Sequence, residues 1–118
     1  MSEDRAKNEH GAVRSKDADK ERYDLISPHI LRALAQTYAE GAEKYGDTNW
    51  LKGFSSGSLL NHALRHLVLW QLGDNSEPHL AHALWNIGAI IHFTETRPEL
   101  VQRQYAEDPY SWTLVAKS

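Results

Sequence analysis

The sequence predicts an all-α protein with three main helices, a polar N-terminal arm and a C-terminal tail. Two observations lead to this fold class. Apolar residues recur at intervals of three and four in the segments 28–45, 58–72 and 78–96, which is the period of an α-helix. Residues typical of turns and helix ends, mainly Gly, Pro, Ser, Asn and Asp, separate these segments.

The domain organisation follows from the distribution of apolar residues. Residues 1–22 are polar and carry almost no large apolar side chain, so we expect an arm that is mobile or lies on another surface. A helical domain is expected over 23–98. The tail, 99–118, is expected to pack on the bundle or on a neighbouring molecule. A chain of 118 residues is long enough for one such domain.

The first helix has clear end signals. Ser27 is expected to be its N-cap, with Pro28 in the first helical position, and the helix is expected to end at Tyr45 before Gly46. A loop follows over residues 46–58. Its Trp50 and Phe54 are bulky for a loop, so they either fill the core or face a ligand.

The second helix is expected to begin at Ser58 as its N-cap and to end at Leu72, with an apolar stripe of Leu60, Ala63, Leu67 and Trp70. The third helix is expected to be capped by Asn75 or Ser76 and to run from Pro78 to Thr96. Its apolar arc, which includes Leu80, Leu84, Ile87 and Ile91, is too wide for a surface helix, so we expect it to be buried. Three such helices do not enclose themselves. We therefore expect a helical bundle that is completed by homo-oligomerisation.

Composition excludes several classes of partner and site. The formal net charge is −3, so duplex nucleic acid is not an expected partner. The absence of cysteine excludes disulfides and thiolate metal sites, and it fits a reducing cytoplasm. No apolar run approaches the roughly 20 residues of a membrane span, and the first residues lack the apolar core of a signal peptide. We expect a cytoplasmic protein that does not enter membranes.

Two carboxylates are the first candidate for chemistry. Glu40 and Glu43 are three residues apart and share one face of the first helix. Paired carboxylates repel each other unless a cation lies between them, and their hard oxygen ligands suit Mg²⁺ or Mn²⁺. The alternative is a solvated helix face beside Lys44.

Histidines on the other two helices are the second candidate. His62 and His66 are four residues apart, so with Arg65 they could clamp a metal or a phosphate. The alternative is that both histidines are half-buried and pack on apolar neighbours. On the third helix His79, His82 and Asn86 share a stripe and either bond across an interface or line a pocket.

The segment 41–50 is the third candidate. Lys44 and Asn49 could contact a ligand, and Tyr45 and Trp50 could stack on a base. The alternative for these aromatic residues is that they anchor the core.

Several motifs occur in a characteristic order: Gly11-Ala-Val-Arg14, Lys20-x-Arg22-Tyr-Asp-Leu, Gly41-Ala-x-Lys44-Tyr45-Gly46-x-x-Asn49-Trp50, Ala63-x-Arg65-His66 and His79-Leu-x-x-Ala-x-Trp85-Asn86. Over about residues 11–97 the sequence resembles the phage-encoded family called dATP/dGTP diphosphohydrolase, N-terminal domain. That family is similar to the all-helical MazG-like nucleotide pyrophosphohydrolases, which hold Mg²⁺ around a triphosphate with an ExxE on one helix and an ExxD on another.

The resemblance assigns roles to particular residues. Glu40 and Glu43 match the first acidic pair, whereas His79 and His82 stand where the ExxD would be expected. This departure favours Mn²⁺ or another transition metal over Mg²⁺, or the loss of the metal. The candidate nucleotide contacts are Arg14, Lys20, Arg22, Lys44, Tyr45, Asn49, Trp50, His62, Arg65, His82 and Asn86.

Two functions remain open from the sequence. The first is hydrolysis of purine (deoxy)nucleoside triphosphates to monophosphate and pyrophosphate. A divalent metal on Glu40 and Glu43 would assist it, with His66 or His79 as acid or base. The second is a non-catalytic oligomeric sponge. Such a protein would sequester a nucleotide second messenger in the host cytoplasm and block antiphage immune signalling.

Overall fold

The all-α prediction is confirmed. The structure is a computed structural model that describes residues 5–7, 9–15 and 20–107. Three α-helices form the body of this part of the chain, and three short 3₁₀ helices accompany them. Their bounds are η1 Tyr23–Leu25, α1 Pro28–Tyr45, η2 Asn49–Lys52, α2 Ser56–Gln71, α3 His79–Thr96 and η3 Pro98–Leu100. Among the residues described, no helix is both long enough and apolar enough to span a membrane.

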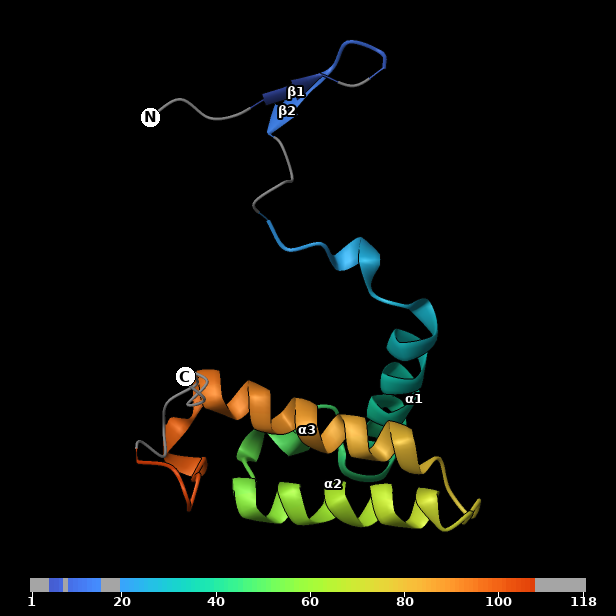
Figure 1. The fold of residues 1–118 in the computed structure, drawn as a ribbon, viewed down its shortest axis with the longest axis vertical. Helices are drawn as coiled ribbons and strands as arrows, with labels where there is room; N and C mark the ends of the chain where they lie inside the picture. The colour runs from blue at the N-terminus through green and yellow to red at the C-terminus, as the bar shows by residue number, and fades with distance from the viewer. Residues whose placement is uncertain (1–4, 8, 16–19, 108–118) are drawn as a thin grey trace, which may run out of the picture.

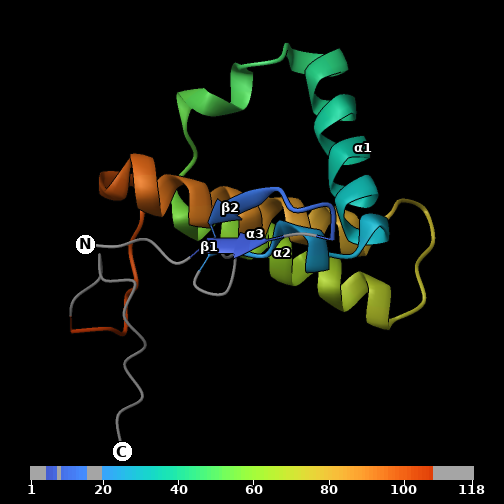
Figure 2. The same ribbon diagram turned by 90° about the horizontal axis from the view of Figure 1, so that it is seen from above.

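The three α-helices form two unequal contacts. α2 and α3 run antiparallel beside each other over most of their lengths, and α1 crosses the first half of α3 at a steep angle (Figures 1 and 2). The segment between α1 and α2 includes η2, and its Trp50 packs against His92 and Phe93 of α3 before the chain enters α2. The site described below lies where α1, η2 and α3 meet.

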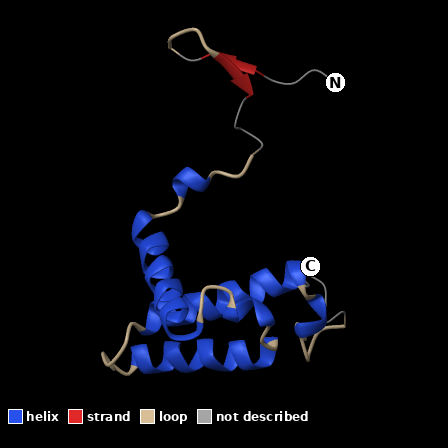
Figure 3. Cartoon of the chain, turned by 180° about the vertical axis from the view of Figure 1, so that it is seen from behind, coloured by secondary structure: helices blue, strands red, loops and turns tan. Residues whose placement is uncertain are grey.

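The N-terminal arm contains a hairpin that the sequence did not predict. β1 (Arg5–Lys7) pairs with β2 (Val13–Ser15) in antiparallel register, with Arg5 opposite Ser15. Each strand is only three residues long, and backbone hydrogen bonds hold the pair together. A pattern of alternating apolar residues, from which strands are predicted, is therefore not present in the sequence. The hairpin stands away from the helices (Figures 1 and 3).

The predicted ends of α1 are confirmed. The Ser27 hydroxyl accepts a hydrogen bond from the His29 backbone N–H at 3.2 Å, and Pro28 is the first helical residue. Gly46 ends the helix with a φ of 96°, a conformation that favours glycine.

The other two helix starts differ from the prediction. α2 is capped by Ser55, whose hydroxyl accepts from the Ser58 backbone N–H at 3.3 Å. Ser58 therefore lies inside the first turn. Neither Asn75 nor Ser76 caps α3, because the Ser76 hydroxyl donates to the Asp74 carboxylate instead.

The buried faces of α2 and α3 also differ from the predicted stripes. The core consists of small and large apolar residues from α2, α3 and the segment after η3, namely Leu59, Ala63, Ala83, Ala89, Phe93 and Val101. Leu60, Leu67 and Trp70 are exposed, because α2 is rotated so that Leu59 and Ala63 face α3. The single chain buries α3 only in part, since Leu80, Ile87 and Ile91 are exposed, and the burial expected from an oligomer stays a prediction.

The C-terminal segment is attached to the core. Val101 is buried, and the Ser56 hydroxyl bridges both sides of the Gln102 backbone, accepting from its N–H at 2.8 Å and donating to its carbonyl at 3.2 Å. Tyr105 is fully exposed. Residues 108–118, for which a packing role of the tail is also predicted, lie outside the described part of the chain.

Candidate functional site

A pocket of about 290 Å³ lies between the C-terminal half of α1, the η2 segment and α3. Five residues predicted as nucleotide contacts line it, and Glu40 lines it as well. The five are Lys44, Tyr45, Asn49, Trp50 and His82. Three further aromatic residues, which were not among the predicted nucleotide contacts, also line it, namely Tyr38, Phe54 and Trp85.

Trp50 explains how the loop builds this pocket. Its indole ring packs against the rings of Tyr38 (centroids 5.6 Å apart), Trp85 (6.1 Å) and His92 (4.7 Å). Gly46 ends α1, and the η2 turn that follows places Trp50 in this aromatic cluster. The two readings of Trp50 are therefore compatible, because one side of the indole packs in the core and another lines the pocket.

The charges of the pocket are mixed. Lys44 contributes a cation near the end of α1, while Glu40 and Asp47 contribute carboxylates. Glu43 is exposed and does not line the pocket. Of the predicted pair, only Glu40 therefore lines the cavity.

A cluster of three histidines lies directly beside the pocket. His66 comes from α2, and His79 and His82 come from α3. His66 Nδ1 lies 2.9 Å from His79 Nδ1, and the ring centroids of His66 and His82 are 5.1 Å apart. Asp74 and Glu77, from the loop between α2 and α3, contribute two carboxylates to the same cluster.

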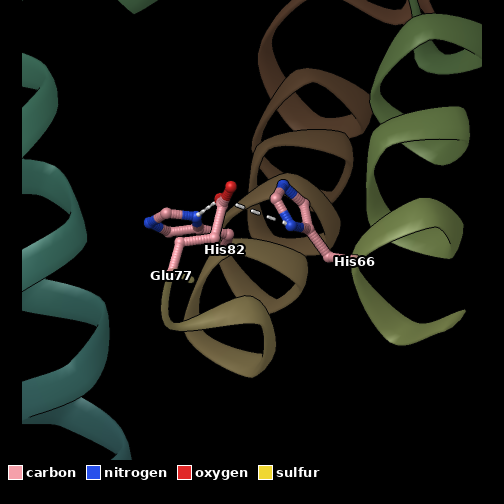
Figure 4. Close-up of side chains that lie close together, drawn as sticks. All are labelled: His66, Glu77 and His82. Carbon is pink, nitrogen blue, oxygen red and sulfur yellow. Dashed lines mark hydrogen bonds and ion pairs between the residues drawn. The ribbon is translucent and has the colours of Figure 1, made fainter. Parts of the chain in front are cut away.

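Glu77 lies between two of the imidazoles (Figure 4). Its Oε1 is 2.6 Å from His82 Nδ1 and 3.7 Å from His66 Nδ1. The hydrogen bond from His82 is the main reason why the pKa of the Glu77 carboxyl is lower than usual. Ligand atoms of His66, Glu77 and His82 all lie within 4.8 Å of one another, so these three side chains could hold a metal ion.

Asp74 orients the buried member of the cluster. The His79 side chain is almost completely buried, and its Nε2 lies 2.5 Å from Asp74 Oδ2. The Ser76 hydroxyl donates to the same carboxylate at 2.6 Å. The hydrogen bond from Ser76 is the main reason why the pKa of the Asp74 carboxyl is lowered, and the hydrogen bond from His79 lowers it further. The carboxylate is therefore ionised and accepts the His79 Nε2–H.

The protonation state of His66 follows from this arrangement. If neutral His79 donates from Nε2, its Nδ1 carries a lone pair and accepts the Nδ1–H of His66. Burial lowers the pKa of His66, and the neighbouring Glu77 charge only partly opposes this effect. The lower pKa favours the neutral imidazole of His66, which has one unprotonated nitrogen.

His82 connects the cluster to the pocket. Its ring lines the cavity, and its Nε2 lies 3.6 Å from Glu40 Oε2 on α1. The two ring nitrogens of His82 therefore face carboxylates on opposite sides. Through this side chain the pocket and the cluster form one continuous polar site.

Other predicted residues lie outside this site. Arg65 is exposed on α2 and does not line the pocket. His62 uses its Nδ1 on the Ser58 carbonyl at 2.8 Å. Asn86 donates to the His82 backbone carbonyl at 2.8 Å.

The basic residues of the N-terminal motifs are also distant. Arg14 lies on β2, in the hairpin that stands apart from the helices (Figure 1). Lys20 is exposed in the segment that leads to η1. Arg22 donates twice to the Asp24 carboxylate at 2.8 Å. Lys20 and Arg22 do not line the pocket.

Sequence reasoning missed Asp74 and Glu77. Both lie in a short loop that is rich in turn-forming residues, and such a sequence predicts only a connection between two helices. The signal that could have found them is their position between two histidine-bearing helices. A short loop must place its own side chains at the end where those helices meet.

Comparison with known families supports the resemblance seen in the motifs. The family described as dATP/dGTP diphosphohydrolase, N-terminal, matches residues 10–103. The matched stretch includes all three α-helices and therefore the whole pocket and the histidine cluster. No curated protein and no solved structure matches the chain.

Proposed function

The chain belongs to the dATP/dGTP diphosphohydrolase, N-terminal, family, and on this basis we propose that it hydrolyses purine (deoxy)nucleoside triphosphates to monophosphates and pyrophosphate. The observation that supports this most directly is the composition of one cavity. It combines an aromatic wall with a lysine, an asparagine and a carboxylate–histidine pair.

Each part of the cavity suits one part of such a substrate. Tyr45 and Trp50 offer ring faces on which a purine base could stack. Lys44 offers a cation for phosphate oxygens, and Asn49 offers an amide that both donates and accepts hydrogen bonds. The volume of about 290 Å³ is near the lower end of the range for small-molecule sites, roughly 300–1,000 Å³. The base and sugar would fill it, and the triphosphate would extend along the rim.

In the proposed reaction, the oxygen of a water molecule attacks the α-phosphorus and the bond from that phosphorus to the bridging oxygen breaks. Pyrophosphate leaves with the bonding electrons, and the water gives up a proton to a base. Glu40 and His82 are the candidates for this base, because they face each other at 3.6 Å in the cavity. His66 and His79, the acid–base candidates from the sequence, lie behind His82 and act as supporting groups in this proposal.

A divalent ion is a further part of the proposal. Glu40 would be a ligand from the pocket side, with Glu43 as the second carboxylate predicted by the ExxE motif. Because histidines replace the second acidic pair, the donors near Glu40 are a mixture of nitrogen and oxygen, which suits Mn²⁺ better than Mg²⁺. When bound, such an ion would neutralise phosphate charge and help to orient the triphosphate.

Turnover is the decisive test. The purified protein is incubated with dATP, dGTP and the pyrimidine triphosphates, with Mg²⁺ or Mn²⁺, and the products are separated by chromatography. Monophosphate and pyrophosphate from the purine substrates support the proposal. Release of inorganic phosphate alone, or no turnover with any nucleotide, contradicts it.

The same experiment separates the enzyme from the sponge hypothesis. Only one carboxylate of the ExxE pair faces the pocket, which is the observation that keeps a binding-only function open. Tight nucleotide binding, with the ligand recovered intact after heat denaturation and no product formed, would favour sequestration.

A further inference from the structure

We propose that His66, Glu77 and His82 form a binding site for a transition-metal ion such as Zn²⁺ where α2, α3 and their connecting loop meet. Two imidazoles and one carboxylate from three separate elements place ligand atoms within 4.8 Å of one another (Figure 4). The role of such an ion in catalysis rests on the proposed function, because His82 also lines the proposed substrate pocket. Metal binding itself can be measured without turnover.

Both ring nitrogens of His82 face carboxylates. Its Nδ1 faces Glu77 at 2.6 Å and its Nε2 faces Glu40 at 3.6 Å. A neutral imidazole has one N–H, so its other nitrogen would direct a lone pair at a carboxylate oxygen, which is repulsive. A metal ion between His82 and one of the carboxylates removes this repulsion.

His66 is oriented as a metal-binding histidine would be. Ligating histidines usually donate their other N–H to a fixed acceptor, and this contact sets the tautomer and the ring orientation. His66 has such an acceptor in His79 Nδ1 at 2.9 Å, and His79 is in turn fixed by Asp74. This chain of hydrogen bonds places the proton of His66 on Nδ1 and leaves Nε2 as the unprotonated nitrogen, so Nε2 is the His66 atom that would bind the metal.

The donor set decides the class of ion. Mg²⁺ prefers six oxygen ligands, whereas Zn²⁺ is commonly bound by two histidines and one carboxylate in catalytic sites. Three protein ligands also leave a coordination position for water or for an oxygen of a bound molecule. We therefore expect the cluster to bind Zn²⁺ far more tightly than Mg²⁺.

Calorimetric titration of the chelator-stripped, untagged protein with Zn²⁺ and with Mg²⁺ tests this site. We expect one Zn²⁺ per chain and a visible absorption spectrum of tetrahedral type when Co²⁺ replaces it. Glu77→Gln and His82→Asn are expected to weaken Zn²⁺ binding by on the order of 100-fold or more. Asp74→Asn acts only through His79 and is expected to cost about 10- to 100-fold.

His29→Gln provides the control, because His29 is an exposed histidine in the first turn of α1 and is not a member of the cluster. Its affinity for Zn²⁺ should equal that of the unmodified protein. Circular dichroism checks that Glu77→Gln, a change at a half-exposed side chain, keeps the fold.

Failure of this inference and failure of the proposed function are distinguishable. Absence of Zn²⁺ binding, or equal affinity in the unmodified protein and Glu77→Gln, overturns the metal site even if nucleotides are hydrolysed with Mg²⁺. Stoichiometric Zn²⁺ binding that depends on Glu77 supports the site even if no nucleotide is turned over.

Discussion

Tyr38 illustrates how packing alone changes the chemistry of one side chain. Its ring lies edge-on to both Trp50 and Trp85, with centroids 5.6 and 6.0 Å away. Burial among these rings raises the pKa of the phenol above its ordinary value of 10.0, because the charged phenolate is poorly solvated there.

A prediction about alkaline stability follows from this pKa. The folded protein keeps the Tyr38 proton at a pH at which the unfolded chain loses it. The contribution of Tyr38 to stability is therefore complete below about pH 10 and is lost as the pH rises through the raised folded-state pKa. Phenolate absorbance should show a late titration step that Tyr38→Phe removes. A titration curve whose last step survives in Tyr38→Phe would contradict this assignment.

Lys44 and Lys52 form a matched pair for testing nucleotide recognition. Lys44 lines the pocket, whereas Lys52, at the end of η2, is exposed and does not. Loss of a charge-assisted contact to phosphate typically costs about 1.5–3 kcal/mol, or roughly 10- to 150-fold in affinity. Lys44→Ala should weaken dATP or dGTP binding by this amount in a calorimetric titration, and Lys52→Ala should leave it unchanged. Equal affinities would place the phosphates elsewhere.

At the scale of elements, two glycines near the start of α2 have opposite roles. Gly53 follows η2 with a φ of 108°, and a Cβ at this position would lie 2.7 Å from Leu100 Cδ1. Gly57 lies in the first turn of α2, and no heavy atom would lie within 4 Å of its Cβ. The first glycine permits a close approach of two segments, while the second only adds freedom to the unfolded chain.

Alanine substitutions should therefore change stability in opposite directions. Gly53→Ala is expected to lower the free energy of unfolding by about 1–3 kcal/mol, because alanine is strained at a φ of 108° and the Leu100 side chain must shift. Gly57→Ala is expected to raise it by about 0.4–1 kcal/mol. Denaturant titration of both variants measures these changes. Equal effects of the two substitutions would contradict the opposite roles assigned to these glycines.

The elements also show which features can be read from sequence. The ends of α1 were predictable because Ser27, Pro28 and Gly46 act locally, through hydrogen bonds and backbone angles of their own residues. The buried face of α2 was not, since Leu59 and Leu60 are equally apolar and only packing against α3 decides between them. His66 and His82 were predicted as site residues from helical spacing. Their partner Glu77 was not, because its contacts depend on how the loop folds.

At the scale of the whole molecule, much apolar surface remains uncovered. Leu60, Leu64 and Val68 lie on one exposed stripe of α2, each with about half of its surface accessible. Apolar surface of this kind is usually covered in a stable assembly. The oligomeric completion of the bundle stays a prediction, and we expect this exposed stripe of α2 to form the contact between subunits.

Light scattering after size-exclusion chromatography tests this prediction. We expect an oligomer at micromolar concentration and a smaller species when Leu64→Asp and Val68→Asp are combined, because charges on this stripe oppose its burial. Leu25→Asp, at an exposed position before α1, serves as the control and should leave the mass unchanged. A monomeric unmodified protein would refute the prediction.

The double position of His82 makes two equilibria interdependent. One imidazole belongs both to the wall of the pocket and to the group of side chains around Glu77. A molecule in the pocket that favours one orientation of the His82 ring therefore changes the free energy with which the side chains around Glu77 bind their own ligand. Thermodynamic reciprocity then requires that occupancy behind the ring change the affinity of the pocket by the same factor. The two affinities can therefore be measured against each other, and a common coupling constant should describe both.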